Sequence, residues 1–102
     1  MLGFIKKLFG PGTDYKALVD GGAVIVDVRT PQEYRGGHIK GSLNIPVNTI
    51  GQKVNELKKK GKPVITCCAS GMRSSSAAGI LKQSGIEAYN GGSWFSLQNK
   101  LR

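Results

Sequence analysis

A chain of 102 residues, 39% of them hydrophobic, has the usual size of one compact domain with one core. No apolar run approaches the roughly 20 residues that a membrane-spanning helix requires, so we expect no stable membrane insertion. The two cysteines are adjacent and cannot join distant segments as the disulfides of small secreted domains do. The first ten residues also lack the continuous apolar centre of a secretory signal, and we expect a cytoplasmic protein.

Fifteen Lys and Arg residues against six Asp and Glu residues give a formal net charge of +9, which favours anionic partners without specifying them. The densest basic cluster contains no interleaved aromatic residues, and the chain carries no helix-turn-helix, zinc-finger or RNA-binding motif. This cluster consists of Lys58, Lys59, Lys60 and Lys62. We interpret it as a solvated charged face and expect no nucleic-acid partner.

The first elements predicted along the chain are a helix, a strand and a second helix. Residues 14–19 have helical character, with Thr13 as the expected N-cap. Residues 23–26 form an apolar, largely β-branched run without polar alternation, which is typical of a strand covered on both faces of a parallel sheet. Residues 30–33 spell a capping box with proline at the first helical position, which predicts a short helix that ends at residues 36–37.

The remaining elements alternate between short apolar strands and helices that end at lysines or glycine. We predict strands at 43–45, 64–67 and 86–89, and helices at 48–60, 74–83 and 93–101. This alternation indicates one α/β domain with a parallel sheet, in which ligands bind where strands end and helices begin.

One such junction carries a thiol, because residues 68–73 lie between an apolar strand and an alanine-rich helix. A tight loop there directs backbone N–H groups inward, and the positive end of the helix adds to the field. Such surroundings lower a cysteine pKa from about 8.5 to between about 3.5 and 7.5. Gly71 permits a positive φ, and Arg73 supplies a fixed charge at the rim. Cys68 is therefore the candidate nucleophile.

The sequence Cys-Ala-Ser-Gly-Met-Arg-Ser at residues 68–74 resembles the active-site loop of the rhodanese family, whose leading cysteine becomes a persulfide. Residues 27–46 resemble the first signature of that family, and residues 91–94 resemble its second. The resemblance runs from about Asp14 to the C-terminus, and we assign residues 11–102 to a rhodanese-like domain.

The resemblance implies a three-layer α/β/α fold with a central, mostly parallel sheet of about five strands. It also implies a sulfurtransferase of the thiosulfate type, which takes sulfane sulfur from a small anionic donor and gives it to cyanide, a thiol or a protein thiol. The catalytic residue is Cys68. The substrate-binding loop comprises Ala69, Ser70, Gly71, Met72 and Arg73, and the supporting residues are Asp27, Arg29 and Ser74. We expect a monomer that needs no cofactor.

Two other functions remain open from the residues alone. Counting from Cys67 gives a cysteine, five residues, Arg73 and Ser74, which is the spacing of cysteine-dependent phosphatases. Those enzymes enclose phosphate in a longer loop, and they usually carry histidine where this chain has Thr66. Strand alternation directs Cys67 away from the loop centre, so we interpret it as a packed structural thiol. The second alternative is a non-catalytic binding module. This hypothesis is less favoured, because the nucleophile and its glycine-arginine loop are both present.

Other conspicuous residues are given structural roles. His38 is the single histidine, and without further ligands at metal-binding spacing we expect no metal site. We interpret Trp94 as a core or rim residue. Residues 1–10 carry Leu2, Ile5, Leu8 and Phe9 around two lysines, which is consistent with a short amphipathic helix that packs on the domain or frays.

Overall fold

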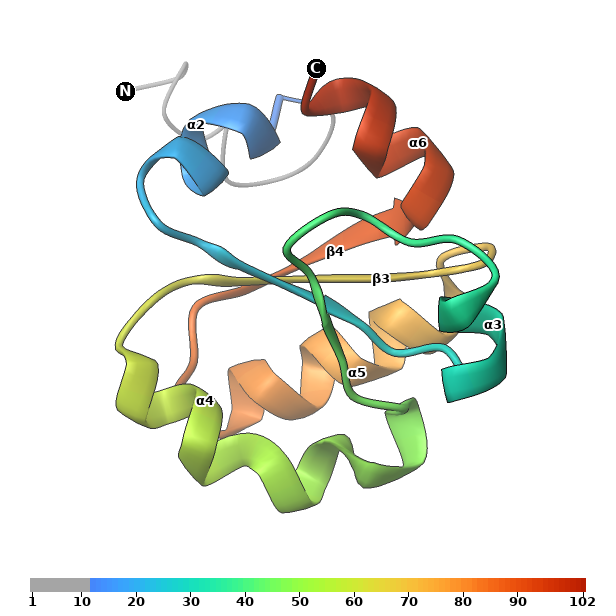
Figure 1. Cartoon of the computed structure of the whole chain (residues 1–102). Coiled ribbons are helices and arrows are strands. Elements are labelled where there is room, and N and C mark those ends of the chain that lie inside the picture. Colours follow the sequence, from blue (N-terminus) through green and yellow to red (C-terminus); the bar gives the residue numbers. More distant parts are fainter. Residues whose placement is uncertain (1–11) are drawn as a thin grey trace.

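The computed structural model describes residues 12–102, which form a parallel sheet covered by helices (Figure 1). The strands, with spatial order β2-β1-β3-β4, are β1 (Val24–Asp27), β2 (Leu43–Asn44), β3 (Val64–Cys68) and β4 (Ala88–Ser93). All three pairings between neighbouring strands are parallel. The four strands seen in this part of the chain are close to the five or so expected. The predicted helix within residues 1–10 lies outside the described residues.

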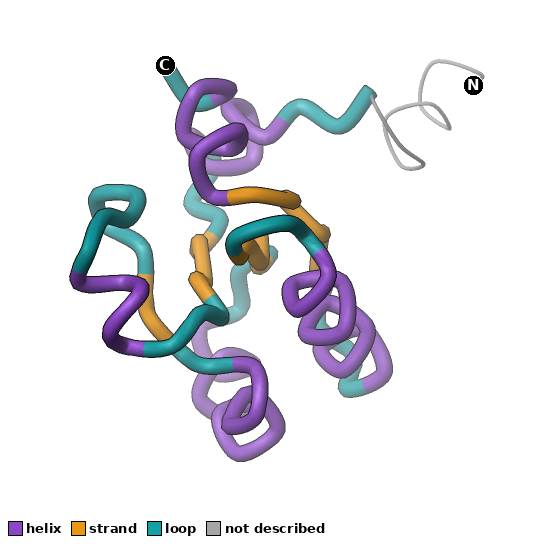
Figure 2. Tube along the Cα trace, turned by 90° about the vertical axis from the view of Figure 1, so that its right-hand side faces the viewer, coloured by secondary structure: helices purple, strands orange, loops and turns teal. Residues whose placement is uncertain are grey.

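The helices form two layers, one on each side of the sheet (Figures 1 and 2). One layer contains α2 (Tyr15–Asp20) and α6 (Trp94–Lys100). The other contains the 3-10 helix η1 (Val47–Lys53), α4 (Val54–Lys60) and α5 (Met72–Gln83). The short helix α3 (Pro31–Arg35) lies at the end of the sheet where α5 and α6 begin (Figure 1). The predicted three-layer α/β/α fold is therefore confirmed. No helix among residues 12–102 is long and apolar enough to cross a bilayer.

Two apolar cores lie on the two faces of the sheet, and strand β3 contributes to both. Val64 and Cys68 pack in the core beneath α4 and α5. Ile65 and Cys67 pack in the core beneath α2 and α6. Successive strand residues point to opposite faces, so the adjacent cysteines face different cores, as the alternation predicts.

Several element boundaries differ from those predicted. Asp14, rather than Thr13, caps α2, because its carboxylate accepts the backbone N–H of Ala17. The predicted helix at 48–60 is divided into η1 and α4. The last strand begins at Ala88 instead of residue 86, because the backbone N–H of Ile86 closes α5 by donating to Leu81 O at 3.0 Å. The capping box at Thr30 and Glu33 is confirmed.

The topology gathers the chemically active residues at one edge of the sheet. Asp27 at the end of β1 pairs in register with Cys67, and Cys68 at the end of β3 pairs with Ser93. Because the strands are parallel, their carboxyl ends meet here, and each strand is followed by a helix. This is the edge at which open α/β sheets bind ligands.

Candidate active site

The Cys68 sulfur lies inside a cradle of hydrogen-bond donors formed by the loop at 69–73. The backbone N–H groups of Gly71 and Ser74 donate to Sγ at 3.0 Å and 3.4 Å. Gly71 adopts φ 103°, a conformation that a residue with a Cβ rarely reaches, and this places its N–H toward the sulfur. Ser74 Oγ lies 3.4 Å from the same atom. The loop therefore encloses the sulfur as the sequence predicts.

The environment of Cys68 favours its thiolate. Burial raises the pKa of this thiol, but hydrogen bonds from the Ser74 hydroxyl and from the N–H groups of Ser74, Gly71 and Ser70 outweigh the burial, and the net pKa is lowered. None of these donors ionises, so they favour the thiolate without a separate general base.

Asn90 braces the loop and was not identified from the sequence. Its Oδ1 accepts the Ser74 hydroxyl at 2.6 Å and the Gly92 N–H at 3.0 Å. Its Nδ2 donates to Gly71 O at 3.2 Å. One side chain thus ties β4 to the middle of the loop, at Gly71, and to Ser74, which directly follows the loop. The Asn-Gly-Gly sequence, which allows an asparagine to bond the N–H two residues ahead, is the signal that would have drawn attention to it.

Arg73 reaches across the mouth of the site to α3. Its guanidinium donates to both carboxylate oxygens of Glu33, at 2.8 Å and 3.1 Å. This contact, followed by backbone and side-chain hydrogen bonds from Thr30, holds the pKa of Glu33 at about 2. The sequence placed Arg73 at the rim but gave its carboxylate partner no role in the site.

A buried ion pair lies at the end of β1, the strand that pairs with the strand carrying Cys68. Arg29 binds both carboxylate oxygens of Asp27, with its Nη2 at 2.8 Å, and also donates to Gly37 O at 2.7 Å. The hydrogen bonds that it donates to Asp27 raise the pKa of the guanidinium. The centroid of the Trp94 ring lies 4.8 Å from Arg29 Cζ, which is the geometry of a cation–π contact. This pair and the indole brace the end of the sheet that carries Cys68.

Cys67 has the opposite character. It is fully buried on the other face of the sheet, and burial, reinforced by the negative charge of Asp27, raises its pKa to about 12. A thiol with that pKa is almost entirely protonated at neutral pH. The geometry therefore gives Cys67 the packing role that the sequence suggests.

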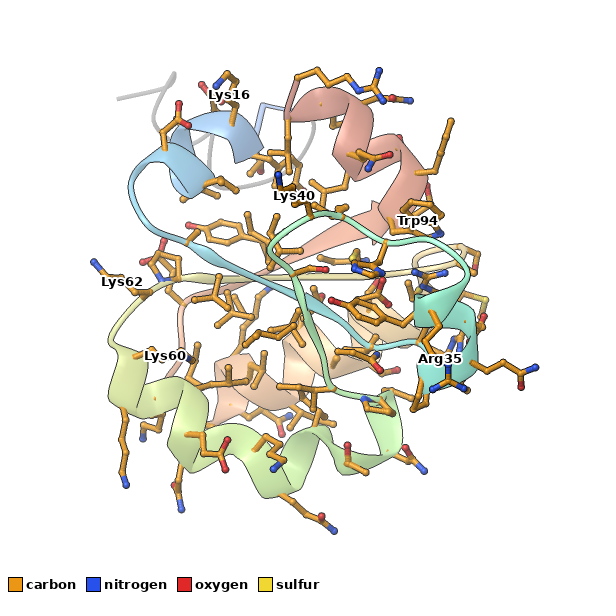
Figure 3. All side chains as sticks on the ribbon, in the orientation of Figure 1. Lys16, Arg35, Lys40, Lys60, Lys62 and Trp94 are labelled. Atoms are coloured by element: carbon orange, nitrogen blue, oxygen red, sulfur yellow. The ribbon has the colours of Figure 1, made fainter. Side chains whose placement is uncertain are left out.

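Some of the other residues singled out from the sequence lie at the mouth of the site, and others lie far from it. Ala69, Ser70 and Met72 are exposed, Met72 to 79% of its surface. His38 stacks on Tyr34, with 3.7 Å between ring centroids, in a local structural contact. Lys60 and Lys62 lie at one end of the sheet, and Trp94 and Arg35 lie at the other (Figure 3). The lysine cluster is thus distant from the site.

Comparisons with known proteins agree with this arrangement. A family model described as a rhodanese-like domain matches residues 12–97. The uncharacterized protein YqhL of Bacillus subtilis is 44% identical over 69 residues, which cover 67% of this chain and 54% of that protein. The thiosulfate sulfurtransferase GlpE of Pseudomonas syringae is 36% identical over 76 residues, which cover 74% of this chain and 71% of that protein.

A crystal structure of a rhodanese-like domain protein from Staphylococcus aureus has the same fold. It superposes with a TM-score of 0.70 at 32% identity, over 82% of this chain and 81% of that chain. The chain spans about half the length, or less, of several of the curated relatives that it matches.

Proposed function

The chain belongs to the rhodanese family, and from this premise we propose that it is a sulfurtransferase that carries sulfane sulfur as a persulfide on Cys68. The family includes thiosulfate sulfurtransferases. The observation that carries the proposal is the pair of backbone N–H groups, from Gly71 and Ser74, directed at the Cys68 sulfur. They stabilise the attacking thiolate, and the same donors suit the negative charge on the outer sulfur of a persulfide.

The reaction proceeds in two displacements at sulfur. The Cys68 thiolate attacks the outer sulfur of a donor such as thiosulfate, and the S–S bond of the donor breaks. Its electron pair leaves with sulfite. An acceptor then attacks the outer sulfur of the Cys68 persulfide and the thiolate is regenerated. Cyanide becomes thiocyanate, whereas a small-molecule thiol or a protein thiol becomes a persulfide.

Access to the sulfur depends on the loop. The Cys68 side chain has no exposed surface, whereas Ala69 and Ser70 directly beside it are exposed. The sulfur is thus covered in this structure, and a donor can reach Sγ only when the atoms that cover it move. We propose that the enzyme acts in this way as a cytoplasmic monomer without a cofactor.

The phosphatase alternative requires the reactive sulfur at the start of a longer loop, at Cys67. That thiol packs beneath α2 and α6, on the face of the sheet away from the cradle. No observation on the described residues favours this alternative, and none favours a purely non-catalytic binding module.

Intact mass measurement without reductant tests the proposal. After incubation with thiosulfate, the protein should gain one sulfur atom, which cyanide then removes. Cys68→Ser should gain none, and Cys67→Ser should load. Absence of loading of the folded protein by thiosulfate, by thiosulfonates and by persulfides would contradict the sulfurtransferase reading. Loading of Cys68→Ser with failure of Cys67→Ser would move the reactive sulfur to Cys67.

A further inference from the structure

We propose that Glu33 sets the charge specificity of the sulfur donor, by neutralising Arg73 so that the site favours a singly charged sulfane-sulfur anion over a dianion. Thiosulfonates and persulfides without further charged groups belong to the favoured class, and thiosulfate belongs to the disfavoured class. The inference rests on the proposed sulfur transfer at Cys68. It concerns which donor is used, rather than whether sulfur is transferred.

The first observation is the geometry of the ion pair. Arg73 is the second residue of α5 and lies directly beside the cradle. Its Nη1 and Nη2 nevertheless both donate to the carboxylate of Glu33. A guanidinium held by two parallel bonds to one carboxylate has its charge compensated and its orientation fixed. The side chains are 36% and 37% exposed, so the pair lies on the surface that an incoming donor meets.

The second observation is that Glu33 is fixed independently of Arg73. Its Oε1 also accepts the backbone N–H of Thr30 at 3.0 Å and the Thr30 hydroxyl at 3.1 Å. The capping box of α3 therefore holds the Glu33 carboxylate at the mouth of the site through contacts that do not involve Arg73. Its pKa of about 2 keeps it ionised throughout the pH range in which a thiolate reacts.

The third observation is that the other arginine next to the site is also neutralised. Arg29 is bound to Asp27 and is 5% exposed. The exposed Arg35 of α3 lies at the same end of the molecule (Figure 3), where solvent and salt screen its charge. The charges of Arg73 and Arg29 are thus cancelled at the place where two anions, the thiolate and the donor, must meet.

Because the charge of Arg73 is compensated, Coulomb's law predicts that the site prefers a monoanionic donor to a dianionic one. The work of bringing a donor to a thiolate scales with the charge of the donor, so a dianion meets about twice the repulsion of a monoanion. An unpaired Arg73 would offset this repulsion, and it would do so twice as strongly for the dianion. The carboxylate of Glu33 removes that compensation.

A matched pair of donors isolates the effect of charge. Thiosulfate and methanethiosulfonate both present an outer sulfur bonded to an oxidised sulfur, but a methyl group in the second replaces one charged oxygen of the first. In each case the Cys68 thiolate attacks the outer sulfur and the S–S bond breaks. The electron pair leaves with sulfite or with methanesulfinate, and the protein becomes the same persulfide.

The experiment compares Glu33→Gln with the unaltered protein. Glutamine removes the charge but preserves the capping box. The second-order rate constant for loading, measured by quenched-flow and intact mass, should rise about tenfold with thiosulfate and about threefold with methanethiosulfonate, because the logarithm of the effect scales with donor charge. Both increases should shrink as the salt concentration rises from 0.05 M to 0.5 M, since the Debye length falls.

Glu56→Gln is the matched control. Glu56 is also an ion-paired glutamate, 3.6 Å from Lys53, but it lies on α4, away from the mouth of the site. This variant changes the net charge of the protein by the same amount, and the ratio of the two loading rates should stay as in the unaltered protein. Thr30→Ala, which weakens the cap and leaves the Glu33 charge in place, should also keep that ratio.

Equal changes for both donors in Glu33→Gln would show that Glu33 only supports the loop, and they would overturn the inference. The inference would also be overturned if Glu56→Gln raised the ratio of the thiosulfate rate to the methanethiosulfonate rate as much as Glu33→Gln does. If Glu33→Gln does not fold, Glu33→Ala must raise the ratio in its place, and an unchanged ratio there would refute the inference. Failure of both donors to load the folded, unaltered protein would instead count against the proposed sulfur transfer at Cys68.

Discussion

The Ser74 hydroxyl donates to Asn90 Oδ1 at 2.6 Å while its oxygen lies 3.4 Å from the Cys68 sulfur. One proton therefore stands between two acceptors. With a neutral thiol, the S–H group donates to Ser74 and the hydroxyl donates to Asn90. When Cys68 ionises, the hydroxyl can turn toward the sulfur, and Asn90 Oδ1 still accepts the N–H of Gly92. The asparagine thus permits the change of partner without leaving its own oxygen unpaired.

The first prediction concerns Ser74→Ala. Removing the hydroxyl eliminates the side-chain hydrogen bond that lowers the Cys68 pKa, so the pH midpoint of Cys68 alkylation should move upward. Iodoacetamide reaction at pH 7, followed by mass spectrometry, should be several-fold slower. Ser75→Ala is the control, because Ser75 is the exposed neighbour on the same helix and its backbone N–H bonds to Gly71 O. A midpoint that moves downward in Ser74→Ala would show that the hydroxyl acts on the sulfur only as an acceptor.

The loop around Cys68 was predictable because its signals are local. A cysteine at the end of an apolar strand, followed by glycine and the start of a helix, places N–H groups around the sulfur wherever such a junction occurs. The opposite directions of Cys67 and Cys68 follow in the same way from the period of a strand. The capping box of α3 also depends only on residues 30–33.

Asn90 and Glu33 were not assigned to the site because their roles depend on tertiary contacts. The Arg73–Glu33 pair joins residues 40 positions apart, and the Ser74–Asn90 bond joins residues 16 positions apart. Only the docking of α3 and β4 against the start of α5 makes either contact. The division of residues 48–60 into a 3-10 helix and an α-helix was missed for a similar reason, because periodicity alone does not distinguish the two forms over short segments.

The second prediction concerns Cys67→Ser. Cys67 has no exposed surface and packs among apolar residues of the core beneath α2 and α6. A hydroxyl placed there without a hydrogen-bond partner should lower the free energy of unfolding by about 1 to 3 kcal/mol. Urea unfolding measures this cost. Because its pKa is about 12, Cys67 of the unaltered protein should resist alkylation at pH 8 until the protein unfolds. Rapid alkylation of both thiols in the folded protein would contradict the packing role.

The third prediction concerns the Asp27–Arg29 pair. Arg29→Met leaves the Asp27 carboxylate buried without its cation, and this should lower the free energy of unfolding by about 3 to 5 kcal/mol. Combining it with Asp27→Asn removes the unpaired charge and should recover part of the loss. Lys16→Met is the control, because it breaks a pair of 3.3 Å whose side chains are more than half exposed. Its expected cost is about 0 to 1 kcal/mol. A loss in Arg29→Met no larger than that of the control would show that water reaches the pair.

The last prediction compares alanine at two glycines. A Cβ at Gly91 would lie 2.8 Å from the backbone oxygen of Thr66 and 2.9 Å from both Ile65 and Leu97 side-chain atoms, so β4 would have to move away from β3. We expect Gly91→Ala to lower the free energy of unfolding by about 1 to 3 kcal/mol or more.

The same displacement would shift Asn90, the preceding residue, from the Ser74 hydroxyl, and sulfur loading should fall along with stability. A Cβ at Gly79, within α5, meets nothing within 4 Å. Gly79→Ala should therefore stabilise the protein by about 0.5 to 1 kcal/mol through the helix propensity of alanine and leave loading unchanged. Thermal unfolding and intact mass measurement of both variants test the two sites together. Normal stability and loading in Gly91→Ala would mean that the close approach of β4 to β3 is not needed to hold the cradle around Cys68.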